Sequence, residues 1–94
     1  PANNFILNDN YPNPFNPLTK ISYELVTDGI VNIIIYDLKG RKIKTLTSGF
    51  QTAGIKNVNW NATNNQGQAV SAGVYLYSIE AGDFRSTKKM VLLK

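Results

Sequence analysis

Six carboxylates are the strongest candidates for acid–base chemistry in this 94-residue chain, because it contains neither histidine nor cysteine. Three of them, Asp28, Asp37 and Asp83, lie in or beside predicted turns, where aspartate commonly caps its own backbone. The others are Asp9, Glu24 and Glu80. A glycosidase-like pair would need two carboxylates roughly 5–10 Å apart across a cleft, and the sequence pattern indicates no cleft. We therefore predict that the chain has no catalytic residues and is not an enzyme.

Metal and cofactor sites are also not expected. Without cysteine or histidine the chain has no thiolate zinc ligands, and it lacks the commonest transition-metal ligand. The polar stretch from Asn61 to Ala72 is rich in Asn and Gln but has no carboxylate, which argues against a calcium loop. Its Asn61-Ala62-Thr63 tripeptide matches an N-glycosylation acceptor. We treat this match as incidental in an Asn-rich chain, and we predict no cofactor.

Basic residues gather at the C-terminal end. The net charge is +4, and Phe84 to Lys94 contains Arg85, Lys88, Lys89 and Lys94 but no acid, whereas the rest of the chain is neutral. Adjacent side chains on a strand point to opposite faces, so Lys88 and Lys89 do not form one patch. No phosphate-binding glycine loop or RNA-binding aromatic motif accompanies them. We therefore expect no nucleic-acid partner, and edge-strand lysines also deter aggregation.

Two pairs of residues at a spacing of two could form either a sugar-stacking platform or part of a core. These pairs are Val58 with Trp60, and Tyr75 with Tyr77. Aromatic residues at this period among β-branched neighbours favour the core.

Alternating apolar residues and turn signals predict about seven short strands and no helix. The expected strands are Phe5–Leu7, Thr19–Leu25, Ile30–Asp37, Arg41–Phe50, Ile55–Trp60, Gly73–Glu80 and Phe84–Lys94. This pattern favours an all-β fold, an immunoglobulin-like antiparallel β-sandwich. A five-stranded oligonucleotide-binding barrel would leave two strands unexplained. The Ile30–Asp37 strand is apolar on both faces, which indicates a central position.

The N-terminal region should be less regular. We expect residues 1–10 to form a linker and a short first strand, and residues 11–94 to form the domain. Three prolines between Tyr11 and Pro17 predict an extended or polyproline-like edge segment. No apolar run reaches the ~18–20 residues of a membrane helix. Because the chain begins with Pro1 rather than methionine, we expect it to be a fragment or a processed product.

Several short motifs follow one another in a characteristic order along the chain. They are Asn10–Pro17, Thr19–Leu25, Ile35–Arg41, Ala53–Gly54, Val58–Trp60, Asn65–Gly67, Ser71–Tyr77, Ala81–Gly82 and Thr87–Lys94. This order closely resembles the type A C-terminal sorting domain of the bacterial type IX secretion system. It is also similar to the immunoglobulin-like domain of flagellar hook-capping proteins, which shares the Trp…Asn-x-x-Gly…Gly-Val-Tyr stretch. One departure is Asn61-Ala62, where the sorting family usually has Asp-Gly.

The resemblance implies a delivery signal on a larger exported protein. Its implied partners are the outer-membrane translocon, a sortase-like cysteine peptidase and an N-terminal cargo domain of the same polypeptide. The cargo would be secreted or attached to anionic lipopolysaccharide at the cell surface. The implied recognition residues are Gly82, Lys88, Lys89, Met90, Val91, Leu92, Leu93 and Lys94. The implied structural motif comprises Pro12, Asn13, Pro14, Trp60, Gly73, Val74 and Tyr75.

Two other functions stay open. The chain could be an accessory module of an extracellular hydrolase, with a carbohydrate-binding role, or a self-assembling module of the hook-capping kind. The identity of the cargo, the recognised face and the oligomeric state do not follow from the sequence.

Overall fold

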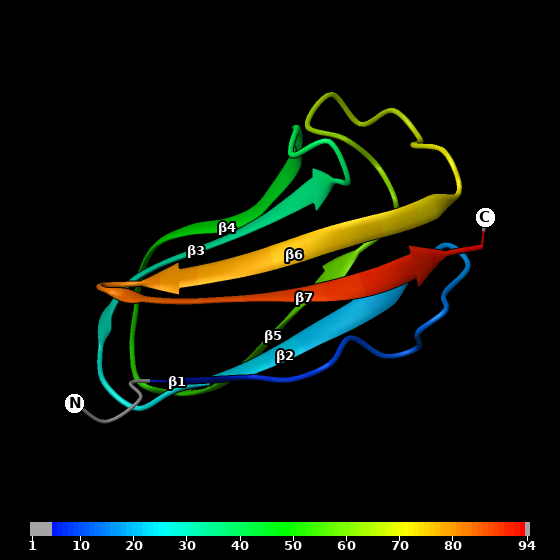
Figure 1. Cartoon of the computed structure of the whole chain (residues 1–94). Helices are drawn as coiled ribbons and strands as arrows, with labels where there is room; N and C mark the ends of the chain where they lie inside the picture. Colours follow the sequence, from blue (N-terminus) through cyan, green and yellow to red (C-terminus); the bar gives the residue numbers. More distant parts are fainter. Residues whose placement is uncertain (1–4, 94) are drawn as a thin grey trace.

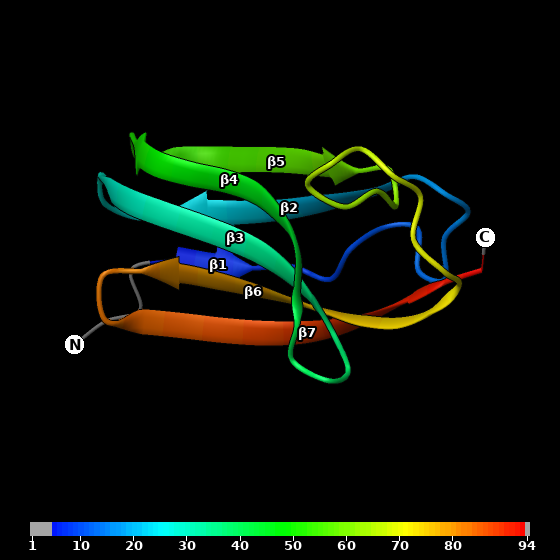
Figure 2. The ribbon, with the colours of Figure 1, turned by 90° about the horizontal axis from the view of Figure 1, so that it is seen from above.

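Seven strands form two packed antiparallel sheets in the computed structural model, which describes residues 5–93 (Figures 1 and 2). One sheet has the order β1-β2-β5 and the other the order β4-β3-β6-β7. The strands are β1 Phe5–Leu7, β2 Thr19–Leu25, β3 Gly29–Asp37, β4 Lys42–Gln51, β5 Gly54–Trp60, β6 Gly73–Ala81 and β7 Phe84–Leu92. The predicted seven-stranded sandwich is confirmed, and the five-stranded barrel is excluded. No helix that could span a membrane occurs in the described part of the chain.

The core follows from the alternation seen in the sequence. In β2 every second residue is buried, whereas the residues between them are exposed or half-buried. β3, β6 and β7 contribute their own alternating set from the facing sheet. The core-facing buried members of these strands are Thr19, Ile21, Tyr23, Leu25, Val31, Ile33, Ile35, Tyr75, Tyr77, Ile79, Met90 and Leu92. Ser78 of β6 is buried as well. Each large apolar side chain buried in this way stabilises the fold by roughly 1.5–3 kcal/mol.

The β3 strand is central, as predicted, but only one of its faces is covered. It lies between β4 and β6, and Val31, Ile33 and Ile35 face the other sheet. On the opposite face Ile30 is 59% exposed and Ile34 is half-buried. A two-layer sandwich covers each sheet on one side alone, so β3 is central in its sheet without being buried on both faces.

Trp60 occupies the centre of an aromatic cluster between the sheets. It is 1% exposed, and its ring lies 5.8 Å from that of Phe15 and 5.4 Å from that of Tyr75. Its indole N–H donates to the carbonyl of Thr63 at 2.8 Å, so the polar atom is satisfied. The Tyr75 hydroxyl donates to the Ser71 carbonyl at 2.6 Å, which resembles the tyrosine corner of immunoglobulin-like domains. The core interpretation of these aromatic residues is confirmed.

Aspartates stabilise two of the turns. Asp37 Oδ1 accepts the backbone N–H groups of Lys39 and Arg41, both at 2.9 Å. The N–H of Arg41, assisted by its guanidinium and by the N–H of Lys39, holds the pKa of the Asp37 carboxyl below its usual value. Asp28 Oδ1 accepts the N–H of Ala53 at 2.7 Å. The predicted capping of its own backbone is confirmed for Asp37, whereas Asp28 instead joins the β2–β3 turn to the β4–β5 turn.

Tyr77 ties the chain before β2 to the four-stranded sheet. Its hydroxyl accepts the N–H of Asn10 at 2.9 Å and donates to the carbonyl of Asn8 at 3.1 Å. Burial, together with the charge of Asp9, raises the pKa of Tyr77 from 10.0 to about 12, although the hydrogen bond from Asn10 partly opposes this change.

We predict that Tyr77 contributes a fall of roughly 2 kcal/mol in the free energy of unfolding between pH 10 and pH 12. In that range the unfolded chain loses the Tyr77 proton while the folded chain retains it, so a rise in pH favours unfolding. Tyr77→Phe should reduce this slope. It should also cost about 1–3 kcal/mol at neutral pH, because the Asn10 N–H loses its acceptor. Urea unfolding at several pH values checks both effects.

The control for this experiment is Tyr11→Phe, because Tyr11 is 78% exposed. It should change neither the slope nor the stability at neutral pH. A Tyr77→Phe variant that keeps the parent's full alkaline slope would contradict the prediction.

Candidate functional site

The implied recognition residues lie along β7, which is an edge strand of the four-stranded sheet as expected. Gly82 forms the two-residue turn before β7 with Asp83, and its φ of +59° is a conformation that glycine adopts without steric cost. Leu93 follows the strand and is 60% exposed. Lys94 lies outside the described residues.

The side chains of β7 alternate between the core and the surface. Met90 and Leu92 are fully buried, so a partner cannot contact them in the folded domain. Lys89 is exposed on the outer face, where Val91 is half-buried. Lys88 lies on the opposite face, and its Nζ is 3.2 Å from Asp9 Oδ1. The prediction that Lys88 and Lys89 do not form one patch is confirmed.

The end of β7 is hydrogen-bonded to the proline-rich segment of residues 11–17, which we call the proline clip. The Val91 N–H donates to the Asn13 side-chain carbonyl at 3.0 Å, and the Phe15 N–H donates to the Val91 carbonyl at 3.0 Å. The Leu93 N–H donates to the Phe15 carbonyl at 2.8 Å. Figure 1 shows this blue segment passing beside the end of β7. The clip therefore acts as a short parallel neighbour of β7 at this point.

The shape of the proline clip differs from the expected extended or polyproline-like form. Tyr11 pairs with Lys20 of β2, whereas Phe15 pairs with Leu92 of β7, so the clip crosses from one sheet to the other. It does so through bends, with cis peptide bonds before its three prolines. The bent segment pairs with both sheets and also buries Phe15 against Trp60. The expected edge position is correct, and the expected regular conformation is wrong.

Other members of the implied structural motif lie in the clip or at the start of β6. The Pro12 carbonyl accepts the Thr19 hydroxyl at 2.8 Å. Gly73 opens β6 with a φ of +145°, a conformation that side-chain-bearing residues rarely adopt. Val74 is half-buried on the outer face, and Tyr75 belongs to the core. The sequence singled out Asn13, but nothing in its neighbours revealed that it binds Val91.

The rest of the β7 edge remains unpaired within residues 5–93. The backbone N–H and C=O groups of Val91 point away from β6, toward the clip. In an antiparallel pair this orientation recurs at every second residue, so Lys89, Thr87 and Arg85 share it. These three residues are not bonded to the clip, and they form what we call the free edge. A free edge can accept an additional strand.

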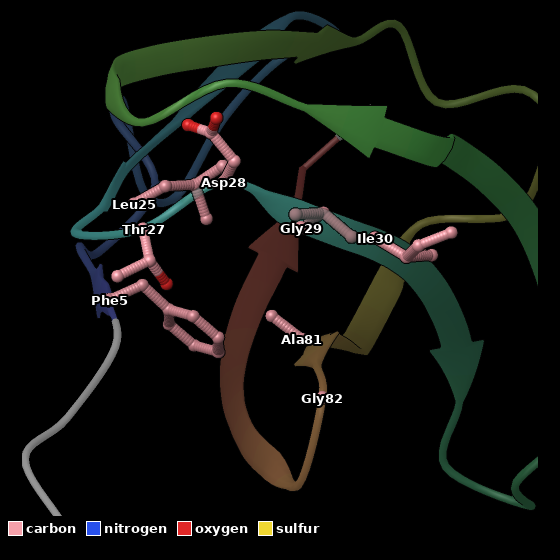
Figure 3. A pocket seen from close by; sticks show the side chains of 9 residues that line it. Phe5, Leu25, Thr27, Asp28, Gly29, Ile30, Ala81 and Gly82 are labelled. Atoms are coloured by element: carbon pink, nitrogen blue, oxygen red, sulfur yellow. The ribbon is translucent and has the colours of Figure 1, made fainter.

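Two surface hollows within residues 5–93 contain a carboxylate, and each contains a single one. The hollow in Figure 3 has a volume of about 250 Å³ and lies between the β2–β3 loop and the β6–β7 turn. Asp28 is its one carboxylate within the described residues, and it already accepts the Ala53 N–H. A second hollow of about 460 Å³ contains Asp37, which is paired with Arg41 at 2.7 Å. In residues 5–93 no group of three or more His, Cys, Asp or Glu side chains is placed to hold a metal ion.

Comparison with known proteins gives a family and several similar folds. The model of the family described as FlgD Ig-like domain matches residues 22–83. No curated protein sequence matches the chain. PorU from Porphyromonas gingivalis, described as dimeric and latent, is similar over 94% of this chain with a TM-score of 0.73 and 20% identity.

Two further solved structures have the same fold. PorZ from Porphyromonas gingivalis, described as an essential surface component of the type-IX secretion system, covers 92% of this chain with a TM-score of 0.64 and 22% identity. FlgD from Xanthomonas campestris, described in connection with hook capping, covers 93% with a TM-score of 0.64 and 22% identity. The chain spans 9% of PorU, 11% of PorZ and 64% of this FlgD. At these identities the likeness shows the fold alone.

The clip generates a prediction about local stability. Asn13→Ala removes the acceptor of the Val91 N–H, which should cost about 1 kcal/mol and speed exchange of that amide roughly fivefold. Native-state hydrogen exchange measured by NMR checks this rate. Asn57→Ala, at an exposed position in β5, should leave the Val91 amide unchanged. Equal exchange rates for Val91 in the parent and in Asn13→Ala would show that the clip does not hold the end of β7.

Proposed function

We propose that this chain, which belongs to the FlgD Ig-like domain family, is a non-catalytic recognition module, a C-terminal sorting domain of the type IX secretion system. In this function the folded domain is bound by the outer-membrane translocon. A sortase-like peptidase then separates it from an N-terminal cargo, which is released or attached to the cell surface.

One observation carries the proposal. Two of the motifs that carry the resemblance to sorting domains, Asn10–Pro17 and Thr87–Lys94, lie at opposite ends of the sequence. In the structure these motifs are one unit, since Asn13 and Phe15 hold Val91 and Leu93 through three hydrogen bonds. A signal that requires both motifs is consistent with a partner that binds the folded end of the sandwich. The fold shared with PorZ, a type-IX secretion component, supports a role for this chain in the same secretion system.

The free edge of β7 supplies a way to bind the translocon. Strand addition to an exposed edge gives affinity through backbone hydrogen bonds. The outward backbone N–H and C=O groups of Arg85, Thr87 and Lys89 are available to an added strand. They continue the row of hydrogen-bonding groups that the clip occupies at Val91 and Leu93. A cargo would join near β1, whose Phe5 ring lies 4.0 Å from that of Phe84 at the start of β7. The cargo and the clip would therefore lie at opposite ends of the sandwich (Figure 1).

A structural role of the hook-capping kind is the second candidate. The family match and the likeness to FlgD favour it, because both concern the domain of a hook-capping protein. A carbohydrate-binding role has less support, because Trp60, Tyr75 and Tyr77 are buried in the core. A domain that mediates self-assembly should form oligomers at micromolar concentration, whereas a sorting domain need not, so analytical ultracentrifugation separates the two candidates.

The export test needs substitutions rather than a terminal deletion. Deletion of residues 89–94 would remove Met90 and Leu92 from the core, and truncating one such side chain already costs about 2–5 kcal/mol. Export would then fail through unfolding. Thr87→Pro is a sharper change, because it removes one outward N–H of the free edge and leaves the backbone hydrogen bonds to β6 in place. The hydrogen bond from the Thr87 hydroxyl to Ser78 is lost in Thr87→Pro and in Thr87→Ala alike.

We predict that a secreted reporter with this domain at its C-terminus is exported by a type IX-competent strain, and that Thr87→Pro lowers the exported fraction about tenfold or more. Loss of one strand-addition hydrogen bond and the clash of the ring with an incoming strand are the physical reasons. Immunoblotting of medium and surface fractions measures the effect, and thermal unfolding of the purified variant verifies that it folds.

Thr87→Ala is the matched control, since it retains the N–H and should be exported like the parent. Normal export of a folded Thr87→Pro variant would show that the free edge is not what the machinery binds. Failure of the parent domain to export the reporter would refute the sorting function itself.

A further inference from the structure

The β3–β4 hairpin carries a second basic cluster, which the sequence order hides. Residues 39–44 include Lys39, Arg41, Lys42 and Lys44. Outside the C-terminal segment the acids balance the bases in number, so a count along the sequence assigns the excess positive charge to that segment. In the fold, however, the hairpin belongs to the same sheet as β7, and its tip projects beyond that sheet in Figure 2.

Strand register places one lysine of each cluster on the same face. Lys42 lies opposite Tyr36, Tyr36 lies opposite Leu76, and Leu76 lies opposite Lys89. The β3 residue that precedes Tyr36 is Ile35, which faces the core, so Tyr36 and its partners face outward. The four residues thus form a row across β4, β3, β6 and β7 on the outer face of the sheet.

A β-bulge makes this row possible. The register of β3 and β4 shifts between Ile35 and Tyr36, so Ile43 is an extra residue and packs against the core. Without that shift Ile43, rather than Lys42, would lie opposite Tyr36. Bulges commonly redirect a side chain in this way.

The centre of the row is apolar and its two ends are charged. Tyr36 and Leu76 are half-buried, and beside them Val74 pairs with Val91, both also half-buried. Lys42 and Lys89 are exposed. Three strand spacings separate the lysines, which is roughly 14 Å. We call these six residues the basic-ended strip.

The acids of this sheet do not neutralise the strip. Asp37 is paired with Arg41 at 2.7 Å, and Glu80 with Arg85 at 3.3 Å. Glu80 lies opposite Asn32, four residues along β3 from Tyr36. Within residues 5–93 neither Lys42 nor Lys89 has an ion-pair partner. The strip therefore combines an open apolar centre with two uncompensated positive charges.

We propose that the basic-ended strip is a docking surface for an acidic face of another protein, with acids about 14 Å apart around an apolar centre. An apolar centre with a polar rim is the usual anatomy of a protein interface, and charge complementarity speeds encounter. A polysaccharide would gain little from Leu76, Val74 and Val91, which offer no side-chain hydrogen bonds. This inference rests on the surface alone and does not depend on export.

The test uses fluorescent poly(Glu,Tyr), an acidic polymer with apolar side chains, and compares it with poly-Glu, alginate and phosphatidylglycerol vesicles. The purified domain should bind poly(Glu,Tyr) roughly tenfold more tightly than the other three, because the strip offers an apolar centre that suits a tyrosine ring between acids. Lys42→Glu combined with Lys89→Glu should weaken binding of poly(Glu,Tyr) more than tenfold. Leu76→Ser should remove most of the difference in affinity between poly(Glu,Tyr) and poly-Glu.

The control is Lys20→Glu combined with Lys56→Glu, which makes the same change in net charge on the other sheet. It should retain most of the affinity for poly(Glu,Tyr). An equal loss in both double variants would mean non-specific attraction and would overturn the proposal. Binding of alginate or of the vesicles as tightly as poly(Glu,Tyr) would overturn it in favour of a glycan or a membrane.

Discussion

The packing of Phe15 against Trp60 is the contact on which this end of the sandwich depends. Trp60 ends β5 and is 1% exposed, and the chain before β2 supplies an apolar side chain that packs against it. This side chain is Phe15, and its backbone is then fixed by Val91 and Leu93. An aromatic contact between the sheets is therefore coupled to hydrogen bonds at the edge of one of them.

This coupling determines which part of β7 a partner can reach. The last residues of the strand are occupied by the clip, and Met90 and Leu92 are in the core. The accessible features are the outward backbone from Arg85 to Lys89 and the side chains of the outer face. A short C-terminal motif can thus be essential for two different reasons, since some of its residues complete the fold while others face solvent. Mutating each position of the motif does not by itself distinguish residues that complete the fold from residues that contact a partner. The burial and hydrogen bonds of each residue do distinguish them.

Local patterns predicted the strands well and the long-range contacts poorly. The bounds of β2 follow from its strict alternation, and the turn at Gly82 follows from glycine beside aspartate. The alternation of β7 also placed Lys88 and Lys89 on opposite faces. The bends of the clip were missed, because they are set by the need to pair with β2 and β7 at once. Proline content restricts the backbone but does not reveal which strands a segment must reach.

The convergence of Lys42 and Lys89 was missed for a related reason. It depends on the strand order β4-β3-β6-β7 and on a one-residue bulge at Ile43. A shift of one residue reverses the face that a side chain occupies, so charge counted along the sequence says little about charge on a surface. Lys42, one of the hairpin bases that balanced the acids in the count, lies on the outer face of the sheet, where within residues 5–93 no acid pairs with it. Asp37 and Glu80 are each engaged by an arginine, and the lysines at the two ends of the strip retain their charge. The positive charge of this face is therefore set by the strand register. The C-terminal strand β7 supplies one of its two lysines, and β4 supplies the other.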